Sequence, residues 1–110
     1  MCNYQTLFHD DNIGYVIRCG ECEKIQMGYG NLMVTFNTED FIAFRCWLRK
    51  IKDDIHPSQK ETIRSIVIPT PCEGMKLLMS IRELRDFDTM LEQADSELQS
   101  LYLIKLLEQG

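Results

Sequence analysis

The sequence predicts an α+β fold, in which an antiparallel sheet in β-β-β-β-α-β-β-α order has both helices packed on one face. Three observations support this prediction: short apolar segments between turn signals before residue 37, an amphipathic helical pattern after it, and a long heptad-like pattern over 81–108. Consecutive strands with short connections pair antiparallel, and both helices then cover one face. A chain of 110 residues has the size of one domain, so we expect a single domain over 1–110.

Four strands are expected before the first helix, over residues 4–9, 13–18, 23–29 and 32–36. The first two flank the turn-like run Asp10-Asp11-Asn12 and therefore predict a β-hairpin. In the third, Ile25 and Met27 alternate with polar residues and should share one face. Gly30-Asn31 is a turn signal before the fourth strand, which is apolar and β-branched.

The first helix is predicted to begin after Asn37 or Thr38 as its N-cap and to end before Pro57. Its apolar residues at helical spacing form one stripe, which consists of Phe41, Phe44, Leu48, Ile51 and Ile55. Two further strands, 63–68 and 75–79, are expected to form a second hairpin. The loop 69–74 between them holds two prolines and a glycine, which disfavour a β-ladder.

A long helix over 81–108 is predicted to complete the chain. The segment Ser80-Ile81-Arg82-Glu83 fits a capping box. Apolar residues then recur every three or four positions, at Leu84, Phe87, Leu91, Ala94, Leu98 and Leu101. Asp95-Ser96 could divide this pattern into two helices, so both alternatives stay open.

The charge balance limits the classes of partner. With 12 Lys and Arg against 17 Asp and Glu, the net charge is −5, which argues against nucleic acids and anionic membranes. A local basic cluster consists of Arg45, Arg49, Lys50 and Lys52. Because Asp53 and Asp54 follow at once, we interpret it as a solvated helix face rather than a phosphate-binding patch.

The chain is expected to be cytoplasmic. It contains no apolar run of about 18 residues that could form a transmembrane helix. Residues 1–11 lack the basic start and the apolar stretch of a signal peptide. In a reducing compartment the five cysteines would be thiols or metal ligands rather than disulfides.

Cys19-x-x-Cys22 is the sharpest local motif, since two thiolates two residues apart at a turn can hold one edge of a tetrahedral Zn²⁺. If the first two strands pair, Cys2 lies near Cys19, whereas His9 lies roughly 17 Å away at about 3.3 Å per residue. The metal hypothesis therefore names Cys2, Cys19 and Cys22. Cys46 and Cys72 remain alternatives for a fourth ligand, and a reduced turn without metal is the competing interpretation.

A thiol enzyme is the weakest hypothesis. Redox enzymes place a C-x-x-C pair at a helix N-terminus, whereas the residues after Cys22 predict a strand. His9 and His56 are the only histidines, and neither is tied by sequence to a nucleophile. No catalytic residue is therefore proposed.

The end of the long helix predicts self-association. There are few polar positions around the helix in the runs Leu101-Tyr102-Leu103-Ile104 and Leu106-Leu107, and a helix that is apolar on all sides is covered on more than one. A symmetric partner could supply that cover. The predicted interface comprises Leu98, Leu101, Tyr102 and Ile104. The alternative is that this segment folds into the chain's own core or frays.

Several motifs together resemble a family of small, uncharacterised bacterial proteins, a domain of unknown function. They are C-x-Y-x-T-L-F (Cys2–Phe8), G-Y-V-I-R-C-x-x-C (Gly14–Cys22), Q-M-G-Y-G-N (Gln26–Asn31) and S-I-R-E-L-R-D-F (Ser80–Phe87). A phenylalanine-rich helix, here with Phe41 and Phe44, follows in that family as well. The resemblance implies a bacterial, cytoplasmic, single-domain protein, and it brings no activity or cofactor to carry over.

The function favoured by these observations is a non-enzymatic binding or interaction domain, homodimeric and open to another protein partner. The alternative is a small zinc protein that uses the Cys19-x-x-Cys22 turn. Neither a nucleic acid nor a membrane is expected as a partner.

Overall fold

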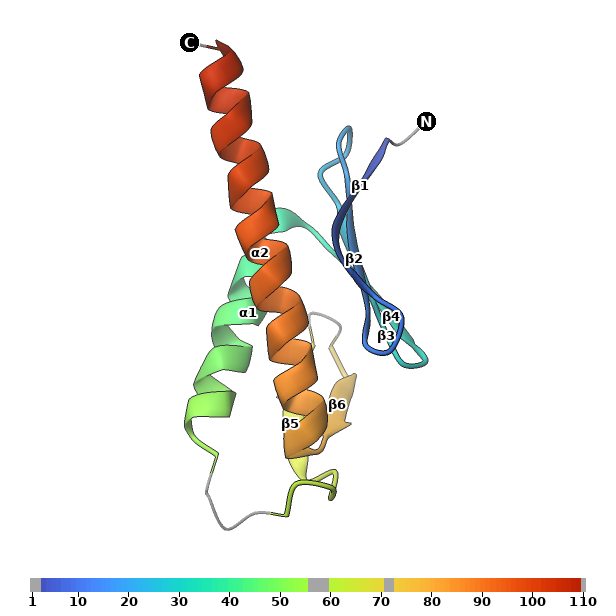
Figure 1. The fold of residues 1–110 in the computed structure, drawn as a ribbon. Coiled ribbons are helices and arrows are strands. Elements are labelled where there is room, and N and C mark those ends of the chain that lie inside the picture. The colour runs from blue at the N-terminus through green and yellow to red at the C-terminus, as the bar shows by residue number, and fades with distance from the viewer. Residues whose placement is uncertain (1–2, 56–59, 71–72, 110) are drawn as a thin grey trace.

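The computed structural model describes residues 3–55, 60–70 and 73–109. The elements follow the predicted order (Figure 1). They are β1 (Tyr4–Asp10), β2 (Gly14–Cys19), β3 (Ile25–Tyr29), β4 (Leu32–Phe36), α1 (Thr38–Asp53), β5 (Ile66–Pro69), β6 (Lys76–Met79) and α2 (Ile81–Gln109).

The strands form two antiparallel sheets. β1-β2-β3-β4 is a four-stranded meander, and β5-β6 is a separate hairpin. Tyr4 pairs with Cys19 and His9 pairs with Tyr15, so the predicted first hairpin and its direction are confirmed. The register of β1 shifts once between Thr6 and Phe8, which leaves Leu7 as the extra residue.

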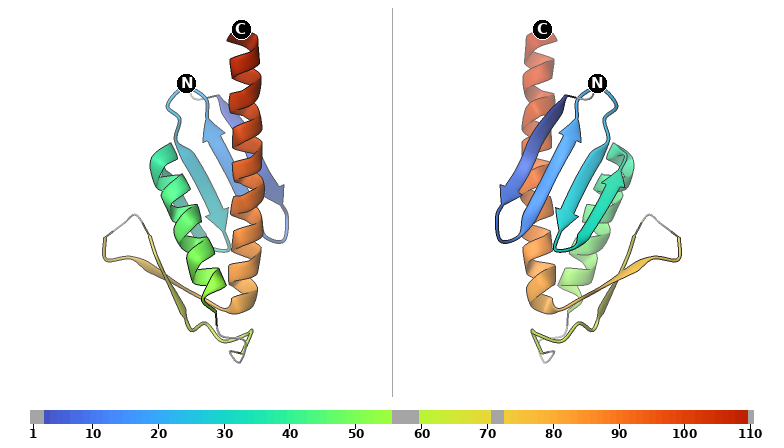
Figure 2. Two further views of the ribbon diagram at one scale, coloured as in Figure 1. Left: turned by 90° about the vertical axis from the view of Figure 1, so that its left-hand side faces the viewer. Right: turned by 90° about the vertical axis from the view of Figure 1, so that its right-hand side faces the viewer.

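Both helices lie on one face of the four-stranded sheet, as predicted (Figure 2). α2 packs over β1 and β2, and α1 packs beside β4. The side chains that point from the sheet toward the helices alternate along the strands, as the pleat requires; they include Val16, Arg18, Ile25, Met27 and Phe36. All but one of these are apolar, and the exception is Arg18.

Phenylalanines join α1 to the sheet and to α2. Asn37 caps the helix, since its Oδ1 accepts a hydrogen bond from the Asp40 N–H at 2.7 Å. Phe41, Phe44 and Leu48 of the predicted stripe are buried, and Ile51 and Ile55 pack against the core. The edge-to-face contacts of this core include Phe36 with Phe41 and Phe44 with Phe87.

Three ion pairs connect the antiparallel helices α1 and α2. They are Lys52–Asp88 at 2.7 Å, Arg49–Glu92 at 3.5 Å and Arg45–Asp95 at 3.6 Å. Arg49, Lys50 and Lys52 are exposed, as the interpretation of a solvated face predicts, whereas the side chain of Arg45 is only 20% exposed. The three basic residues of α1 and their three acidic partners on α2 have the same spacing, four residues and then three. Each set therefore lies along one face of its helix.

The hairpin β5–β6 differs from its prediction at both ends. The strands begin at Ile66 and Lys76 rather than at residues 63 and 75, and Pro69 pairs with Lys76 instead of lying in the loop. Pro69 is tolerated there because it is the last residue of a strand in a two-stranded sheet, where its missing N–H can face outward. Pro57 and Cys72 lie outside the described residues.

Helix α2 is unbroken at Asp95-Ser96. Asp95 is buried and is held by Arg45 and by the Gln99 side-chain amide, which donates to Asp95 Oδ2 at 3.0 Å. The helix is longer than the layer it covers, and its carboxyl-terminal end projects beyond the sheet (Figure 1). Within the described residues, no helix is both long and apolar enough to cross a membrane.

Candidate functional site

The cysteine motif lies in the turn between β2 and β3. Cys19 ends β2 with only 1% of its surface exposed, whereas Cys22 is exposed. The backbone N–H of Cys22 donates to Cys19 Sγ at 3.4 Å, and the Glu23 N–H donates to the Cys19 carbonyl oxygen at 2.9 Å. Glu23 has φ of 59°, a left-handed conformation that is uncommon for a residue with a side chain. This tight turn presents the two cysteines on one loop.

The predicted metal ligands are only partly within the described residues. Cys2 lies outside them, although Asn3 accepts a hydrogen bond from the Gly20 N–H at 2.9 Å, which places residue 3 beside the turn. His9 is at the opposite end of the hairpin, where its Nε2 lies 3.5 Å from Asp11 Oδ1. Among the residues that the structure describes, no group of three or more His, Cys, Asp or Glu side chains could hold a metal ion.

The predicted interface residues differ in their exposure. Leu98 is 1% exposed and belongs to the chain's own core. Leu101 and Tyr102 are half-buried and pack against that core, whereas Ile104 is 51% exposed. Leu103, Leu106 and Leu107 belong to the same apolar segment of the sequence, although they are not among the four predicted interface residues; they are 60%, 66% and 74% exposed.

The outer face of α2, opposite Leu98, changes character along the helix. At about 100° per residue, this face carries the exposed polar side chains Thr89, Glu92, Gln93, Ser96 and Ser100. One turn later it carries Leu103 and Leu107, whereas Leu106 lies about 80° around the helix from Leu98. Leu103 and Leu107 therefore do not continue the stripe that packs on the sheet. They point to the opposite side, away from this chain's own core.

A cleft separates the end of β2 from the carboxyl-terminal end of α2. It has a volume of about 370 Å³, and its lining comprises Gln5, Arg18, Gly20, Leu101, Tyr102, Ile104, Lys105 and Glu108. We refer to it as the Arg18 cleft. The pleat of the second strand could have indicated this site, because Val16 and Arg18 are two residues apart and share the inward face.

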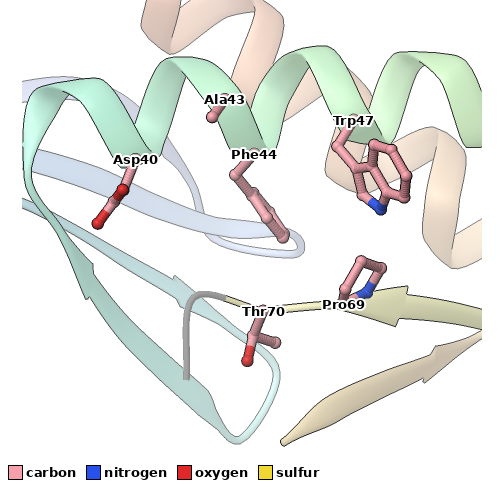
Figure 3. A pocket seen from close by; sticks show the side chains of 6 residues that line it. All are labelled: Asp40, Ala43, Phe44, Trp47, Pro69 and Thr70. Atoms are coloured by element: carbon pink, nitrogen blue, oxygen red, sulfur yellow. The ribbon is translucent and has the colours of Figure 1, made fainter. Parts of the chain in front are cut away.

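A second, shallow groove lies between α1 and β5 and has a volume of about 280 Å³ (Figure 3). In Figure 3, Trp47 faces Pro69, and the Phe44 ring points toward the hairpin. The Thr70 hydroxyl donates to the Met75 carbonyl oxygen at 2.7 Å. The groove is chiefly apolar, and Asp40 supplies the carboxylate in its lining.

The start of α2 holds a charged network that has a structural role. The predicted capping box is present, since the Ser80 N–H donates to Glu83 Oε1 at 3.0 Å and the Glu83 N–H donates to Ser80 Oγ at 3.2 Å. Arg64 donates to both oxygens of Glu83, at 2.9 and 3.0 Å. These bonds, first that from Arg64 and then those from Ser80, hold the pKa of Glu83 below its ordinary value. Burial raises the pKa of Tyr29, which is close enough to Glu83 and Asp86 to feel their negative charge.

The comparisons with known proteins identify a family but no activity. Neither the curated proteins nor the solved structures include a match to this chain. The model described as "Family of unknown function (DUF6686)" matches residues 1–108, nearly the whole chain. The resemblance seen in the sequence is confirmed at this level: the chain belongs to the DUF6686 family of unknown function.

Proposed function

We propose that this protein is a non-enzymatic interaction domain that forms a homodimer through the end of α2. One observation carries the proposal: the outer face of α2 changes from polar to apolar after Ser100, on the side that this chain cannot cover. Leu103, Ile104, Leu106 and Leu107 form this surface, which we call the α2 tip. Exposed apolar patches of this kind mark interaction sites.

The exposed area at the α2 tip supports weak but specific association. Its four side chains expose the equivalent of roughly two and a half leucines per chain, and burying one leucine contributes roughly 1.5–3 kcal/mol. A pair of chains would gain roughly 8–15 kcal/mol, against roughly 4–15 kcal/mol for association and ordering. Because the gain and the cost are of similar size, we expect association that is weak and depends on protein concentration.

A second copy is the partner that fits this surface best. In an isologous dimer the same patch serves both chains, so one apolar tip requires no other complementary surface. An antiparallel crossing of two helices near residue 105 would place Leu103 of one chain against Leu107 of the other. Ile104 of the α2 tip and Lys105 also line the Arg18 cleft, which therefore adjoins this contact.

Sedimentation velocity over the micromolar range tests the proposal. The wild-type mass should rise with concentration toward two chains, whereas Leu103→Asp and Leu107→Asp should remain monomeric, because a carboxylate would be desolvated in the interface. Leu78→Asp is the matched control, since Leu78 is 59% exposed on the β5–β6 hairpin and should leave association unchanged. A wild type that stays monomeric, or association that survives Leu107→Asp, would contradict the proposal.

The second candidate function is zinc binding by Cys2, Cys19 and Cys22, in the reducing cytoplasm. The N–H···S bond from Cys22 to Cys19 favours it, because a donor aimed at the sulfur stabilises the thiolate, the form that ligates metal. Elemental analysis of reduced protein should then give near-stoichiometric zinc, and Cys22→Ser should lose it. Cys46→Ser, also at an exposed cysteine, is the control. A metal-free wild type after purification with added zinc would contradict this candidate.

A further inference from the structure

We propose that Cys19 and Cys22 form a reversible dithiol–disulfide pair that reacts with low-molecular-weight disulfides such as oxidised glutathione. The proposal assigns a modification site to the turn between β2 and β3, and it does not depend on dimer formation or on bound zinc. It rests on how this turn is closed, on the contact between the two cysteines and on the difference in their exposure.

Backbone hydrogen bonds close the turn before any disulfide forms. The Cys19 N–H donates to the Lys24 carbonyl oxygen and the Glu23 N–H donates to the Cys19 carbonyl oxygen, both at 2.9 Å. The flanking strands β2 and β3 are paired up to Arg18 and Ile25. The entropy of bringing the two cysteines together is therefore largely lost when the chain folds, so closing a disulfide ring within this turn costs little more.

The sulfur of Cys19 lies against the backbone of Cys22. The Cys22 N–H donates to Cys19 Sγ at 3.4 Å. Because the Cα of Cys22 is bonded to that nitrogen at about 1.46 Å, this Cα lies no farther than about 4.9 Å from Cys19 Sγ. The Cys22 side chain and an S–S bond of about 2.05 Å span a gap of this size, so rotation of an exposed side chain brings the two sulfurs together.

The two thiols differ in exposure, which sets the order of the exchange steps. Cys22 is exposed, whereas Cys19 is 1% exposed. The Cys22 thiolate therefore attacks one sulfur of oxidised glutathione first, the S–S bond of the reagent breaks, and one glutathione leaves as a thiolate that takes up a proton. The Cys19 thiolate then attacks the Cys22 sulfur of this mixed disulfide, and the second glutathione leaves in the same way.

The balance of the exchange is complete without any other reactant. The two cysteines together lose two electrons and two protons, and one oxidised glutathione becomes two reduced glutathiones. The second step is intramolecular and needs no access from solvent, so the burial of Cys19 does not prevent it. Disulfides in a reducing compartment are usually transient and redox-sensing, which is the behaviour expected of a bond that glutathione can also reduce.

Cys46 provides a comparison within the same chain. It is exposed, as Cys22 is, but α1 contains no other cysteine. A thiol held beside its partner has an effective concentration on the order of millimolar or more, which favours ring closure over the mixed disulfide. We therefore expect the Cys19–Cys22 bond to form in buffers in which Cys46 is still largely reduced.

Equilibration in glutathione buffers of increasing oxidised fraction, followed by acid quenching, trypsin digestion and mass spectrometry, tests the proposal. The protein is first reduced and treated with a chelator, so that zinc cannot shield the sulfurs. Trypsin cleaves after Arg18 and Lys24 and releases a peptide that contains both cysteines of the motif and no other. In the wild type this peptide should lose two hydrogens as the oxidised fraction rises, and dithiothreitol should restore them.

The Leu107→Asp variant should give the same titration as the wild type, because Leu107 does not belong to the turn. A failure of the dimer proposal is therefore distinguishable from a failure of this one. The chelator likewise separates this test from the zinc hypothesis, which requires the same sulfurs with a metal bound.

Serine variants distinguish the roles of the thiols. Cys22→Ser should leave Cys19 reduced, because the exposed thiol that reacts first is missing. Cys19→Ser should stop at a mixed disulfide on Cys22, because no buried thiol displaces the glutathione. Cys46→Ser and Cys2→Ser are the controls and should leave the oxidised fraction within about twofold of the wild type. If Cys19→Ser does not fold, Cys22→Ser and Cys2→Ser decide.

Three results would overturn the proposal. The first is a Cys19–Cys22 peptide that keeps its hydrogens in buffers in which Cys46 already carries glutathione. The second is an intramolecular disulfide at Cys19 that survives Cys22→Ser. The third is loss of the disulfide in Cys2→Ser, which would assign the bond to Cys2 rather than to the two cysteines of the turn.

Discussion

The two ends of α2 both carry apolar side chains but differ in what covers them. From residue 81 to 98 the inward side chains are buried against the sheet and α1, and two acidic residues of this segment are buried in ion pairs with α1. From residue 103 to 107 four apolar side chains are more than half exposed. The difference is not one of helix propensity, because both segments belong to one continuous helix.

This comparison shows that burial of an amphipathic helix depends on the length of the layer opposite it. The sheet and α1 cover α2 from residue 81 to 98, and the carboxyl-terminal end of the helix projects beyond the sheet (Figure 1). Leu103 and Leu107 also lie on the side of the helix opposite Leu98. We therefore expect mutations in the two segments to have distinct consequences.

The largest contrast should come from truncating one buried and one exposed side chain of α2. Phe87 is fully buried, and its ring lies 5.1 Å from that of Tyr29, so Phe87→Ala should lower the free energy of unfolding by roughly 3–5 kcal/mol. Leu106→Ala should change the monomer's unfolding free energy by about 0.5 kcal/mol or less. Urea denaturation at low protein concentration measures both values. Similar losses for the two variants would contradict the division of α2 into a core segment and an interaction segment.

An intermediate effect is expected for the ion pairs between α1 and the buried part of α2, residues 81–98. Asp88→Asn keeps the shape of a buried side chain but removes its charge, so the hydrogen bond from Lys52 weakens and the unfolding free energy should fall by roughly 1–2 kcal/mol. Glu92→Gln is the matched change on the neighbouring turn. Because Arg49 and Glu92 are both about half exposed, that variant should lose less than about 1 kcal/mol. Equal losses would mean that burial does not determine the strength of these ion pairs.

The smallest effect is expected at the first turn of α2 and should depend on pH. Glu83→Gln retains the capping box but removes the charge paired with Arg64 and aligned with the helix dipole, so at neutral pH it should cost less than about 1 kcal/mol. The folded-state pKa of Glu83 lies below its ordinary value of 4.5. Its contribution is therefore complete above that value and is lost as the pH falls through the lowered pKa.

The measurement for Glu83 is the difference in urea midpoint between the wild type and Glu83→Gln across acidic pH. The two proteins should converge as the pH falls, because the carboxyl becomes protonated in both the folded and the unfolded state. If the difference in urea midpoint stays constant with pH, the stabilisation by Glu83 comes from the shape of its side chain rather than from its charge.

Local sequence patterns were sufficient to predict the elements of this fold. The turn at residues 10–12, the stripe that begins at Phe41 and the capping box at Ser80 each depend on residues within a few positions of one another, and all three are present. The family resemblance in the motifs was also confirmed. The predicted ends of the strands were less accurate. The sequence placed Pro69 in a loop, whereas it is the last residue of β5 and pairs with Lys76.

The candidate sites were predicted less well, because they depend on distant contacts. The pattern of α2 indicated an apolar end, but the predicted interface included the buried Leu98, since periodicity does not tell where the covering sheet stops. The acidic partners of the basic residues of α1 were not predicted, because they are more than 30 positions away in sequence. The proposed ligand Cys2 lies outside the described residues, so the metal hypothesis remains a prediction.

Composition and local pattern therefore determined which segments become strands or helices and which of their faces are apolar, because propensity, capping and periodicity act over one or two turns. Only the tertiary structure decided which apolar faces are covered, which acidic residue meets which cation, and that Arg18 is buried with its guanidinium beside the Tyr102 ring of α2. The physical reason is that burial and ion pairing depend on the lengths and relative positions of elements that are far apart in the chain.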